Sequence, residues 1–326
     1  MKYPKSEQYD KQFLLENMMG PNALKILEEL TEGIKLTSDM KILDLGCGKG
    51  LTSIFLAKEF GVQVYATDLW ITAAENFERF KKLGLEDRII PIHANALDLP
   101  YAENYFDAVI SVDSYHYFGN TPEFMDTKLA PYIKPNGIIA LAFPGFKKDY
   151  HNNLPSELLI SWGAEDLDTF HSCKWWHELL SQSQTINIES ISELNCMEEA
   201  WQDWLECDEE HAINDRASMN AGAGKYMNLI AIKAGEFGVK AALNGETGKM
   251  ISFIRKETSD GTYTMECGLE DVNAICNEEK TVPSEWITED GSDVTEAFIN
   301  YARPLIQGTV QIPCGEDGLP SFVYRK

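Results

Sequence analysis

The chain has 326 residues, enough for about two domains and for a large buried core that needs no disulfide or metal to support it. Hydrophobic residues make up 44% of it and charged residues 25%, which excludes a wholly disordered protein. The formal net charge is −24, so we expect neither nucleic acid nor an anionic membrane surface as a partner, because both bind basic faces.

Cysteine usage and hydrophobic runs bear on the compartment. The seven cysteines are odd in number and form no CxxC pair, so we expect reduced thiols. No apolar run approaches the roughly 18–20 residues that span a bilayer, and residues 1–10 lack the apolar stretch of a signal peptide. His171, Cys173 and His177 lie close together, but no ligand pair recurs. We therefore expect a cytoplasmic protein with no membrane span and no metal.

Strand and helix patterns alternate along residues 41–143. Short apolar, β-branched runs predict strands, and apolar residues at helical spacing, ended by Gly61 and Gly84, predict the helices between them. The predicted strands are 41–45, 62–66, 89–92, 106–112 and 137–143, and the predicted helices are 24–33, 51–60, 71–83 and 122–132. Such alternation indicates βαβ units with right-handed crossovers and a parallel sheet covered on both faces.

The pattern becomes less regular after Pro144. Two more strands are predicted at 186–191 and 226–232, and they would complete a seven-stranded sheet. Five tryptophans fall within residues 162–204, where they fit either plain core or an aromatic acceptor pocket. Beyond residue 233, short strands and turns replace the alternation. We therefore predict two domains, residues 1–233 and residues 234–326.

A glycine-rich loop follows the first predicted strand, in ILDLGCGKG at residues 42–50. Its glycines allow a tight turn and let a ligand approach the backbone, and the first N–H groups of the next helix favour an anionic group. The spacing is GxGxG, whereas GxGxxG is typical of dinucleotide binding. For the loop alone, a tight turn without a ligand is the alternative.

A carboxylate ends the second predicted strand. Asp68 closes VYATD at residues 64–68, and its two oxygens can accept both hydroxyls of a ribose. An Asp at the start of a helix is also a common N-cap, which is the alternative for this residue. The combination of Asp68 with the glycine loop favours ligand binding.

Five ordered motifs resemble those of class I S-adenosylmethionine-dependent methyltransferases, over roughly residues 20–233. They are ILDLGCGKG (42–50), VYATD (64–68), HANALDLP (93–100), FDAVISVDSYHYF (106–118) and IKPNGIIAL (133–141). The resemblance implies a Rossmann-like α/β sheet of strand order 3-2-1-4-5-7-6, with strand 7 antiparallel. It also implies S-adenosylmethionine as the cofactor and a small molecule as the methyl acceptor.

The resemblance also implies which residues surround the cofactor. The loop residues would lie at its amino-acid end, Asp68 at its ribose, and the residues beside Asp68 at its adenine. Asn95 stands where many relatives carry an acidic residue, and its amide oxygen can still accept from the adenine amino group. The implied cofactor-binding residues are Asp44, Gly46, Gly48, Gly50, Asp68, Leu69, Trp70, Asn95, Ala96 and Ser111.

The segment after the fourth predicted strand is expected to face the transferred methyl group. Asp113 and His116 are the predicted catalytic residues, His116 as a base and Asp113 attracting an amine or orienting His116. Packing without a chemical role is the alternative for His116. The pattern is similar to that of phosphoethanolamine methyltransferases, with an Asp–His spacing one residue shorter. Tyr3 and Tyr9 are candidates for an N-terminal lid, and an exposed, frayed terminus is the alternative.

The segment from about Glu236 to Leu319 resembles a different family. Residues 239–250, 282–287 and 301–308 are similar to the C-terminal end of pyrophosphate-dependent phosphofructokinases. The sequence lacks that family's GGDGT-type phosphate-binding loop and its catalytic aspartate motif. We therefore interpret the segment as a passive fragment joined to the first domain, with a regulatory or partner-binding role as the alternative.

These observations favour an enzyme that transfers a methyl group from S-adenosylmethionine to a small molecule. One alternative is a module that binds S-adenosylmethionine without turnover. A nucleotide-dependent oxidoreductase is disfavoured by the GxGxG spacing, and a sugar-phosphate phosphotransferase by the missing loops. The acceptor atom, whether N, O, S or C, is left open by these motifs.

Overall fold

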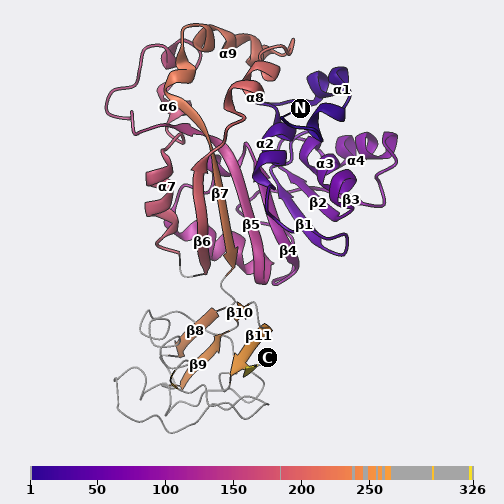
Figure 1. The fold of residues 1–326 in the computed structure, drawn as a ribbon, viewed down its shortest axis with the longest axis vertical. Coiled ribbons are helices and arrows are strands. Elements are labelled where there is room, and N and C mark those ends of the chain that lie inside the picture. The colour runs from indigo at the N-terminus through magenta and orange to yellow at the C-terminus, as the bar shows by residue number, and fades with distance from the viewer. Residues whose placement is uncertain are drawn as a thin grey trace. The chain divides into compact units, whose positions relative to one another are not determined.

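The computed structural model describes residues 2–183 and 185–236, followed by residues 239–244, 249–254, 256–258, 261–265, 296 and 323–324. The chain divides into two compact units. The first unit comprises Met1–Ser183 and Asn187–Gly235, and the second comprises Gln184–Ile186 and Glu236–Lys326. In the first unit, helices flank a central sheet (Figure 1).

The central sheet has seven strands in the order β3-β2-β1-β4-β5-β7-β6. The strands are β1 (Lys41–Leu45), β2 (Gln63–Asp68), β3 (Ile89–His93), β4 (Phe106–Val112), β5 (Ile133–Phe146), β6 (Ile186–Glu193) and β7 (Met227–Glu236). β1 pairs in parallel with β2 and β4, β2 pairs in parallel with β3, and β4 with β5, whereas β7 runs antiparallel to β5. The predicted α/β class, strand order and antiparallel seventh strand are confirmed.

Nine α-helices and several single turns are present in the described part of the chain. The α-helices are α1 (Lys11–Asn17), α2 (Ala23–Leu30), α3 (Leu51–Phe60), α4 (Ala73–Lys82), α5 (Pro122–Phe124), α6 (Ala164–Leu167), α7 (Cys173–Leu180), α8 (Met197–Trp204) and α9 (Glu210–Asn220). The 3₁₀ turns are Ser6–Gln8, Tyr115–Tyr117, Ala130–Tyr132, Leu158–Ile160 and Ala223–Lys225, and a π-helical turn covers Met125–Leu129. None of these helices is long and apolar enough to cross a bilayer.

Local sequence explains where the helices next to the glycine loop begin and end. α3 ends at Gly61, which has a φ of +69°, a conformation that glycine adopts at little cost. α4 begins with a capping box in which Thr72 and Glu75 satisfy each other's backbone N–H groups. The strand before α3 is held in the core, since all of β1 after its first residue is buried.

Two predicted elements differ most from the structure. The helix predicted at 122–132 is divided into α5, a π-helical turn and a 3₁₀ turn, with Pro122 and Pro131 near its two ends. Proline removes a backbone donor, so a continuous helix cannot run through Pro131. The strand predicted at 137–143 extends to Ile133–Phe146, because β5 is central and pairs with β4 on one side and β7 on the other.

The second unit contains short antiparallel strands. β8 (Val239–Asn244) pairs with β9 (Lys249–Ile254), and β11 (Gly261–Met265) pairs with β10 (Lys256–Thr258) and β12 (Val323–Tyr324). Two of the phosphofructokinase-like stretches, 282–287 and 301–308, lie outside the described residues. β7 continues to Glu236, three residues beyond the predicted boundary, and the division at residue 233 stays a prediction.

Candidate functional site

A cavity of about 370 Å³ lies where β1, β2, β3 and β4 end. The carboxyl ends of neighbouring parallel strands meet at one edge of a sheet, which is where open α/β sheets bind ligands. The lining residues come from the four loops after these strands and from an N-terminal segment: residues 45–49, 51, 52, 67–70, 94–97, 112–114, 117 and 118, with residues 17–21 and 23.

The loop after β1 turns tightly against its neighbours. Gly46 and Gly48 line the cavity and have φ values of +75° and +52°, which disfavour any residue with a Cβ. A Cβ on Gly46 would overlap Ser114 Oγ, and one on Gly48 would lie 2.9 Å from Met19 Sδ. Gly50 lies outside the lining, at the N-cap of α3. Two of the three predicted loop glycines therefore face the cavity directly.

Asp44 supports the loop from inside the sheet and does not line the cavity. Its side chain is fully buried, and Oδ2 accepts hydrogen bonds from Thr52 Oγ1 at 2.6 Å and from Ser53 Oγ at 2.5 Å. Burial raises the pKa of Asp44 to about 6, against the opposing effect of these two hydroxyl groups. Its Oδ1 is buried and has no hydrogen-bond partner in the described part of the chain.

Asp68 ends β2 and lines the cavity with a fixed carboxylate. Oδ2 accepts from the Gly48 N–H at 2.8 Å, and Oδ1 accepts from the N–H groups of Trp70 and Ile71 at 2.7 and 2.8 Å. A carboxylate oxygen can accept more than one hydrogen bond, so both oxygens keep capacity for a ligand. The alternative of a helix N-cap is wrong for Asp68, because Thr72 caps α4.

The loops after β2 and β3 add an apolar surface beside Asp68. Leu69 and Trp70 line the cavity, and these residues are 51% and 69% exposed, so they are available to a ligand. Asn95 and Ala96 line it as well, and Asn95 Oδ1 accepts from the Leu97 N–H at 2.9 Å. All four residues predicted for the adenine side therefore lie together with Asp68 at one cavity.

Asp113 follows β4 directly and carries an unusual backbone. Its φ is +56°, and its N–H donates to the Ala142 carbonyl at 2.7 Å. The carboxylate is half-buried in the cavity lining and makes no hydrogen bond or ion pair with any residue that the structure describes. Burial, with a smaller effect from the charge of Asp215, raises the pKa of Asp113 to about 8.

His116 lies in the core next to the cavity. It is fully buried, does not line the cavity, and packs against the rings of Tyr117, Phe143 and Phe170. Neither ring nitrogen has a hydrogen-bond partner in the described part of the chain, and burial lowers the pKa of His116 to about 3. The imidazole is therefore neutral, and its role as a base stays a prediction.

Ser111 is also placed behind the cavity surface. It is fully buried on β4 and does not line the cavity. Its Oγ is 2.9 Å from Ser114 Oγ, and Ser114 in turn donates to the Leu45 carbonyl at 2.9 Å. Ser114 does line the cavity, so Ser111 acts on the site through this hydroxyl pair.

The N-terminal segment lines the cavity with other residues than the two tyrosines that were candidates for a lid. Residues 17–21 and 23 line it, whereas Tyr3 packs beside Glu29 and Tyr9 stacks on Phe55. Neither tyrosine lines the cavity, and the frayed-terminus alternative is wrong because Tyr3 is buried. We call residues 2–22 the strap. Its lining residues belong to no motif, so no sequence signal identified them.

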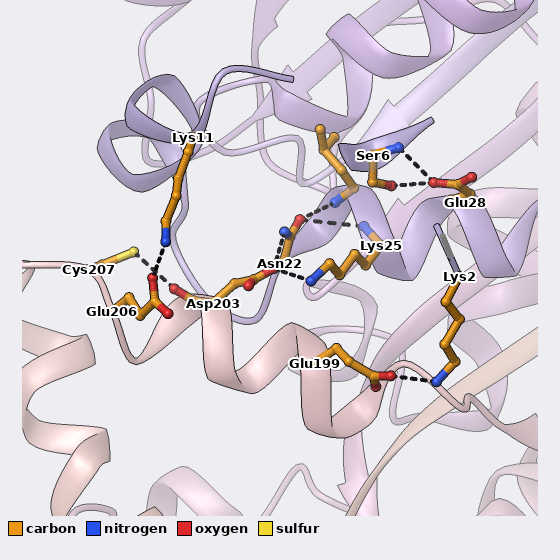
Figure 2. A network of polar contacts seen from close by, with 11 residues as sticks. Lys2, Ser6, Lys11, Asn22, Lys25, Glu28, Glu199, Asp203, Glu206 and Cys207 are labelled. Atoms are coloured by element: carbon orange, nitrogen blue, oxygen red, sulfur yellow. Dashed lines mark hydrogen bonds and ion pairs between the residues drawn. The ribbon is translucent and has the colours of Figure 1, made fainter. Parts of the chain in front are cut away.

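Polar contacts join the strap and the start of α2 to α8 and to Glu206 just after it (Figure 2). The contacts are Lys2–Glu199 at 2.6 Å, Lys11–Glu206 at 2.6 Å, Lys25–Asp203 at 2.7 Å and Asn22–Asp203 at 2.7 Å. Figure 1 shows α1 and α8 at the same end of the sheet, where β5 ends. The strap is thus anchored across the carboxyl ends of the strands, where it covers the cavity.

Comparison with known proteins identifies the type of domain. Residues 43–141 match the family model described as "Methyltransferase domain". Residues 43–141 are thus similar to a methyltransferase domain. Over 119 residues the chain is 30% identical to the methyltransferase GfsG of Streptomyces halstedii. The aligned stretch covers 36% of this chain and 42% of that protein. The chain thus spans less than half the length of this curated relative.

A solved structure and a second relative extend the comparison. A phosphoethanolamine N-methyltransferase of Haemonchus contortus, solved with S-adenosyl-L-methionine, matches with a TM-score of 0.57 at 18% identity, covering 72% of this chain and 60% of that one. At this identity the likeness shows the fold alone. In a separate match, 93 residues of the chain are 39% identical to the pyrophosphate–fructose 6-phosphate 1-phosphotransferase of Methylococcus capsulatus. This match covers 28% of this chain and 21% of that protein.

Proposed function

We propose that the methyltransferase domain binds S-adenosylmethionine in the cavity and transfers its methyl group to a small-molecule acceptor. The observation that carries the proposal is the Asp68 carboxylate, held by three backbone N–H groups beside the Gly46–Gly48 turn. A fixed acceptor of this kind, next to an open backbone turn, fits a ribose with its neighbouring charged tail. The match of residues 43–141 to a methyltransferase domain supports the same ligand.

The residues present fit this cofactor. The cavity volume of about 370 Å³ is within the usual range for small-molecule sites. Gly46 and Gly48 leave space that a Cβ would fill, and the buried Asp44 Oδ1 keeps an unused acceptor beneath the loop. Among the described residues, the ionisable acidic and basic side chains of the lining are Asp68, Asp113 and Lys49, so carboxyl groups outnumber cations, as suits a ligand with a sulfonium.

The chain's own residues would position both reactants. Asp68 would hold the ribose hydroxyls, and Leu69, Trp70 and Ala96 would pack around the purine. When bound, S-adenosylmethionine supplies a methyl group activated by positively charged sulfur. The chain then has to align the acceptor with that methyl group and exclude water. Alignment and water exclusion account for most of the rate acceleration in such a displacement. The strap, through Met18 and Met19, would provide the water-excluding cover.

The compartment and the C-terminal segment are part of the same proposal. The four cysteines in the described part of the chain are unpaired, which supports a cytoplasmic enzyme. We propose residues 1–233 as the catalytic domain and residues 234–326 as a phosphofructokinase-like fragment without activity. The short identity to a phosphotransferase, together with the absence of that family's catalytic motifs from the sequence, supports this assignment.

Two measurements on the purified full chain test the proposed function. Calorimetry with S-adenosylhomocysteine is expected to show one site. Incubation of metabolite pools with S-adenosylmethionine labelled in its methyl group is expected to give a labelled small molecule. Binding without label transfer to any pool would support the non-catalytic module, and absence of binding would overturn the proposal.

A further inference from the structure

We propose that the methyl acceptor is a cationic amine held by Asp113, with aromatic rings of the cavity around it. This inference rests on the proposed methyl transfer and specifies its acceptor. It is based on the unpaired carboxylate of Asp113, its distance from the cofactor-binding carboxylate, the rings beside it and the distribution of charge.

The Asp113 carboxylate is placed in the cavity at a conformational cost. Its φ of +56° is uncommon for a residue with a side chain, although Asp tolerates it better than most. The Gly20 backbone lies so close that a Cβ there would overlap Asp113 Oδ2. A half-buried carboxylate without a hydrogen bond is unfavourable unless a partner arrives. Both residues line the cavity, so a ligand in the cavity can be that partner.

The sheet order separates Asp113 from the cofactor carboxylate. Asp68 ends β2 and Asp113 follows β4, and β1 lies between these two strands. Strands are about 4.8 Å apart, so the two backbones are separated by roughly 10 Å. Asp113 is therefore placed beyond the glycine loop, at the part of the cavity left for the acceptor.

Aromatic rings accompany Asp113 in the lining. Tyr117 and Phe118 follow it in the same loop, and the Tyr117 ring centroid is 6.0 Å from that of Trp70. The faces of such rings attract cations, and methylated ammonium groups are a well-known case. A carboxylate with aromatic neighbours therefore favours an amine over a neutral or anionic acceptor.

The surrounding charges point the same way. Lys49 is the one cation that the described residues bring to the lining, and its Nζ donates to the Glu16 carbonyl of the strap at 3.0 Å. Asp215 on α9 is buried and accepts from Trp204 Nε1 at 2.9 Å, and its negative charge acts on Asp113. Two carboxylates without a cationic partner among the described residues favour a cation and repel an anion.

The same carboxylate can take up the proton that the reaction releases. A protonated amine would give one N–H proton to Asp113, which frees the nitrogen lone pair. That pair forms the new N–C bond while the methyl–sulfur bond breaks, and the bonding electrons stay on sulfur. The products are the methylated amine and S-adenosylhomocysteine, with the proton on Asp113 until it passes to water.

Calorimetry in the presence of saturating S-adenosylhomocysteine tests the inference without relying on turnover. The probes are choline and its uncharged isostere 3,3-dimethyl-1-butanol, which differ in the charge of one atom. At about pH 9, where Asp113 is mostly ionised, we expect choline to bind at least tenfold more tightly. Asp113→Asn is expected to abolish this preference. Because Asn is well tolerated at positive φ, the variant should keep the backbone conformation of the wild type. Asp87→Asn, a matched change at an exposed position, is expected to leave it intact.

The outcomes separate the two proposals. S-adenosylhomocysteine binding without a preference for choline, or an equal preference in wild type and Asp113→Asn, overturns the amine acceptor and leaves methyl transfer standing. A labelled alcohol, thiol or carboxylate from the metabolite pools, with no labelled amine, does the same. If S-adenosylhomocysteine does not bind to the wild type, the proposed function fails and this inference fails with it.

Discussion

The backbone of Gly20 packs against the carboxylate of Asp113 so closely that no side chain fits between them. Gly20 belongs to the strap, and Asp113 follows β4, so the contact joins the cover of the cavity to its proposed acceptor end. It also fixes the side of the carboxylate that is left for a ligand.

Gly20→Ala tests this relationship. The added methyl would overlap Asp113 Oδ2, so either the strap or the carboxylate has to move. We expect the KM for the acceptor to rise by about tenfold, the scale of 1.4 kcal/mol, while the affinity for S-adenosylhomocysteine changes less than threefold. Gly224→Ala is the control, because its Cβ would meet only the flexible end of Met219, at 3.3 Å. Equal KM values in the two variants would contradict the prediction.

Asp68→Ala tests the cofactor site. Removal of the carboxylate takes away the proposed ribose acceptor and leaves three backbone N–H groups without their partner. We expect the Kd for S-adenosylhomocysteine to rise by about tenfold to a hundredfold, or 1.4–2.8 kcal/mol. Calorimetry measures it, with Asp87→Ala as the exposed control and a thermal melt to show that the variant is folded. An unchanged Kd would mean that the ribose binds elsewhere.

The raised pKa of Asp113 predicts a pH dependence for cation binding. With a pKa of about 8, Asp113 is mostly protonated at lower pH, and only its ionised form attracts a cation. The affinity for choline should therefore increase with pH and level off above about pH 8. The expected deficit is about tenfold at pH 7 and about a hundredfold at pH 6. Choline carries a permanent charge, so its own titration does not contribute.

Other titratable groups lie in the cavity lining or act on Asp113 through their charge, and their titration has to be separated from that of Asp113. Burial raises the pKa of Asp215, and burial with neighbouring carboxylates raises that of Tyr117. Lys49 is the cation of the lining. Asp113→Asn leaves all three in place, so its choline affinity should be low and independent of pH from 6 to 9. A slope that persists in this variant would assign the titration to another group.

His116→Phe tests the predicted general base. His116 is surrounded by aromatic rings, is neutral, and does not reach the cavity surface, so a ring without nitrogens should replace it. The change also removes two buried nitrogens without partners in the described part of the chain. We expect kcat to change less than threefold. General bases contribute about 10²–10⁴-fold, so a loss of a hundredfold in a folded variant would establish His116 as the base.

Sequence patterns predicted the sheet and the cofactor side of the site because both depend on local signals. The alternation of elements predicted a parallel sheet, and the resemblance to methyltransferases implied its strand order. The loop after one strand and Asp68 at the end of the next lie at the same edge of such a sheet. The contacts that anchor the strap were not predicted, because Asn22 and Asp203, 181 residues apart, meet only in the folded chain. His116 was expected at the cavity, but periodicity cannot reveal the positive φ of Asp113 that redirects the loop.

The anchoring of the strap gives a last prediction. Asp203 accepts from Asn22 Nδ2 and forms an ion pair with Lys25, whose side chain is 16% exposed. Asp203→Ala leaves both donors without this acceptor, so we expect the free energy of unfolding to fall by about 1–2 kcal/mol. Glu206→Ala breaks only the exposed pair with Lys11, and such pairs contribute about 0–1 kcal/mol.

Hydrogen exchange connects this stability difference to the site. Residues 17–21 lie between the anchoring contacts and the cavity, so Asp203→Ala should increase amide exchange in this part of the strap more than in β1 or β4. S-adenosylhomocysteine should dissociate faster from the same variant, because a loosened cover no longer retains the ligand. A variant that is less stable throughout, with no selective exchange at residues 17–21 and an unchanged dissociation rate, would show that Asp203 supports the fold without holding the cover closed.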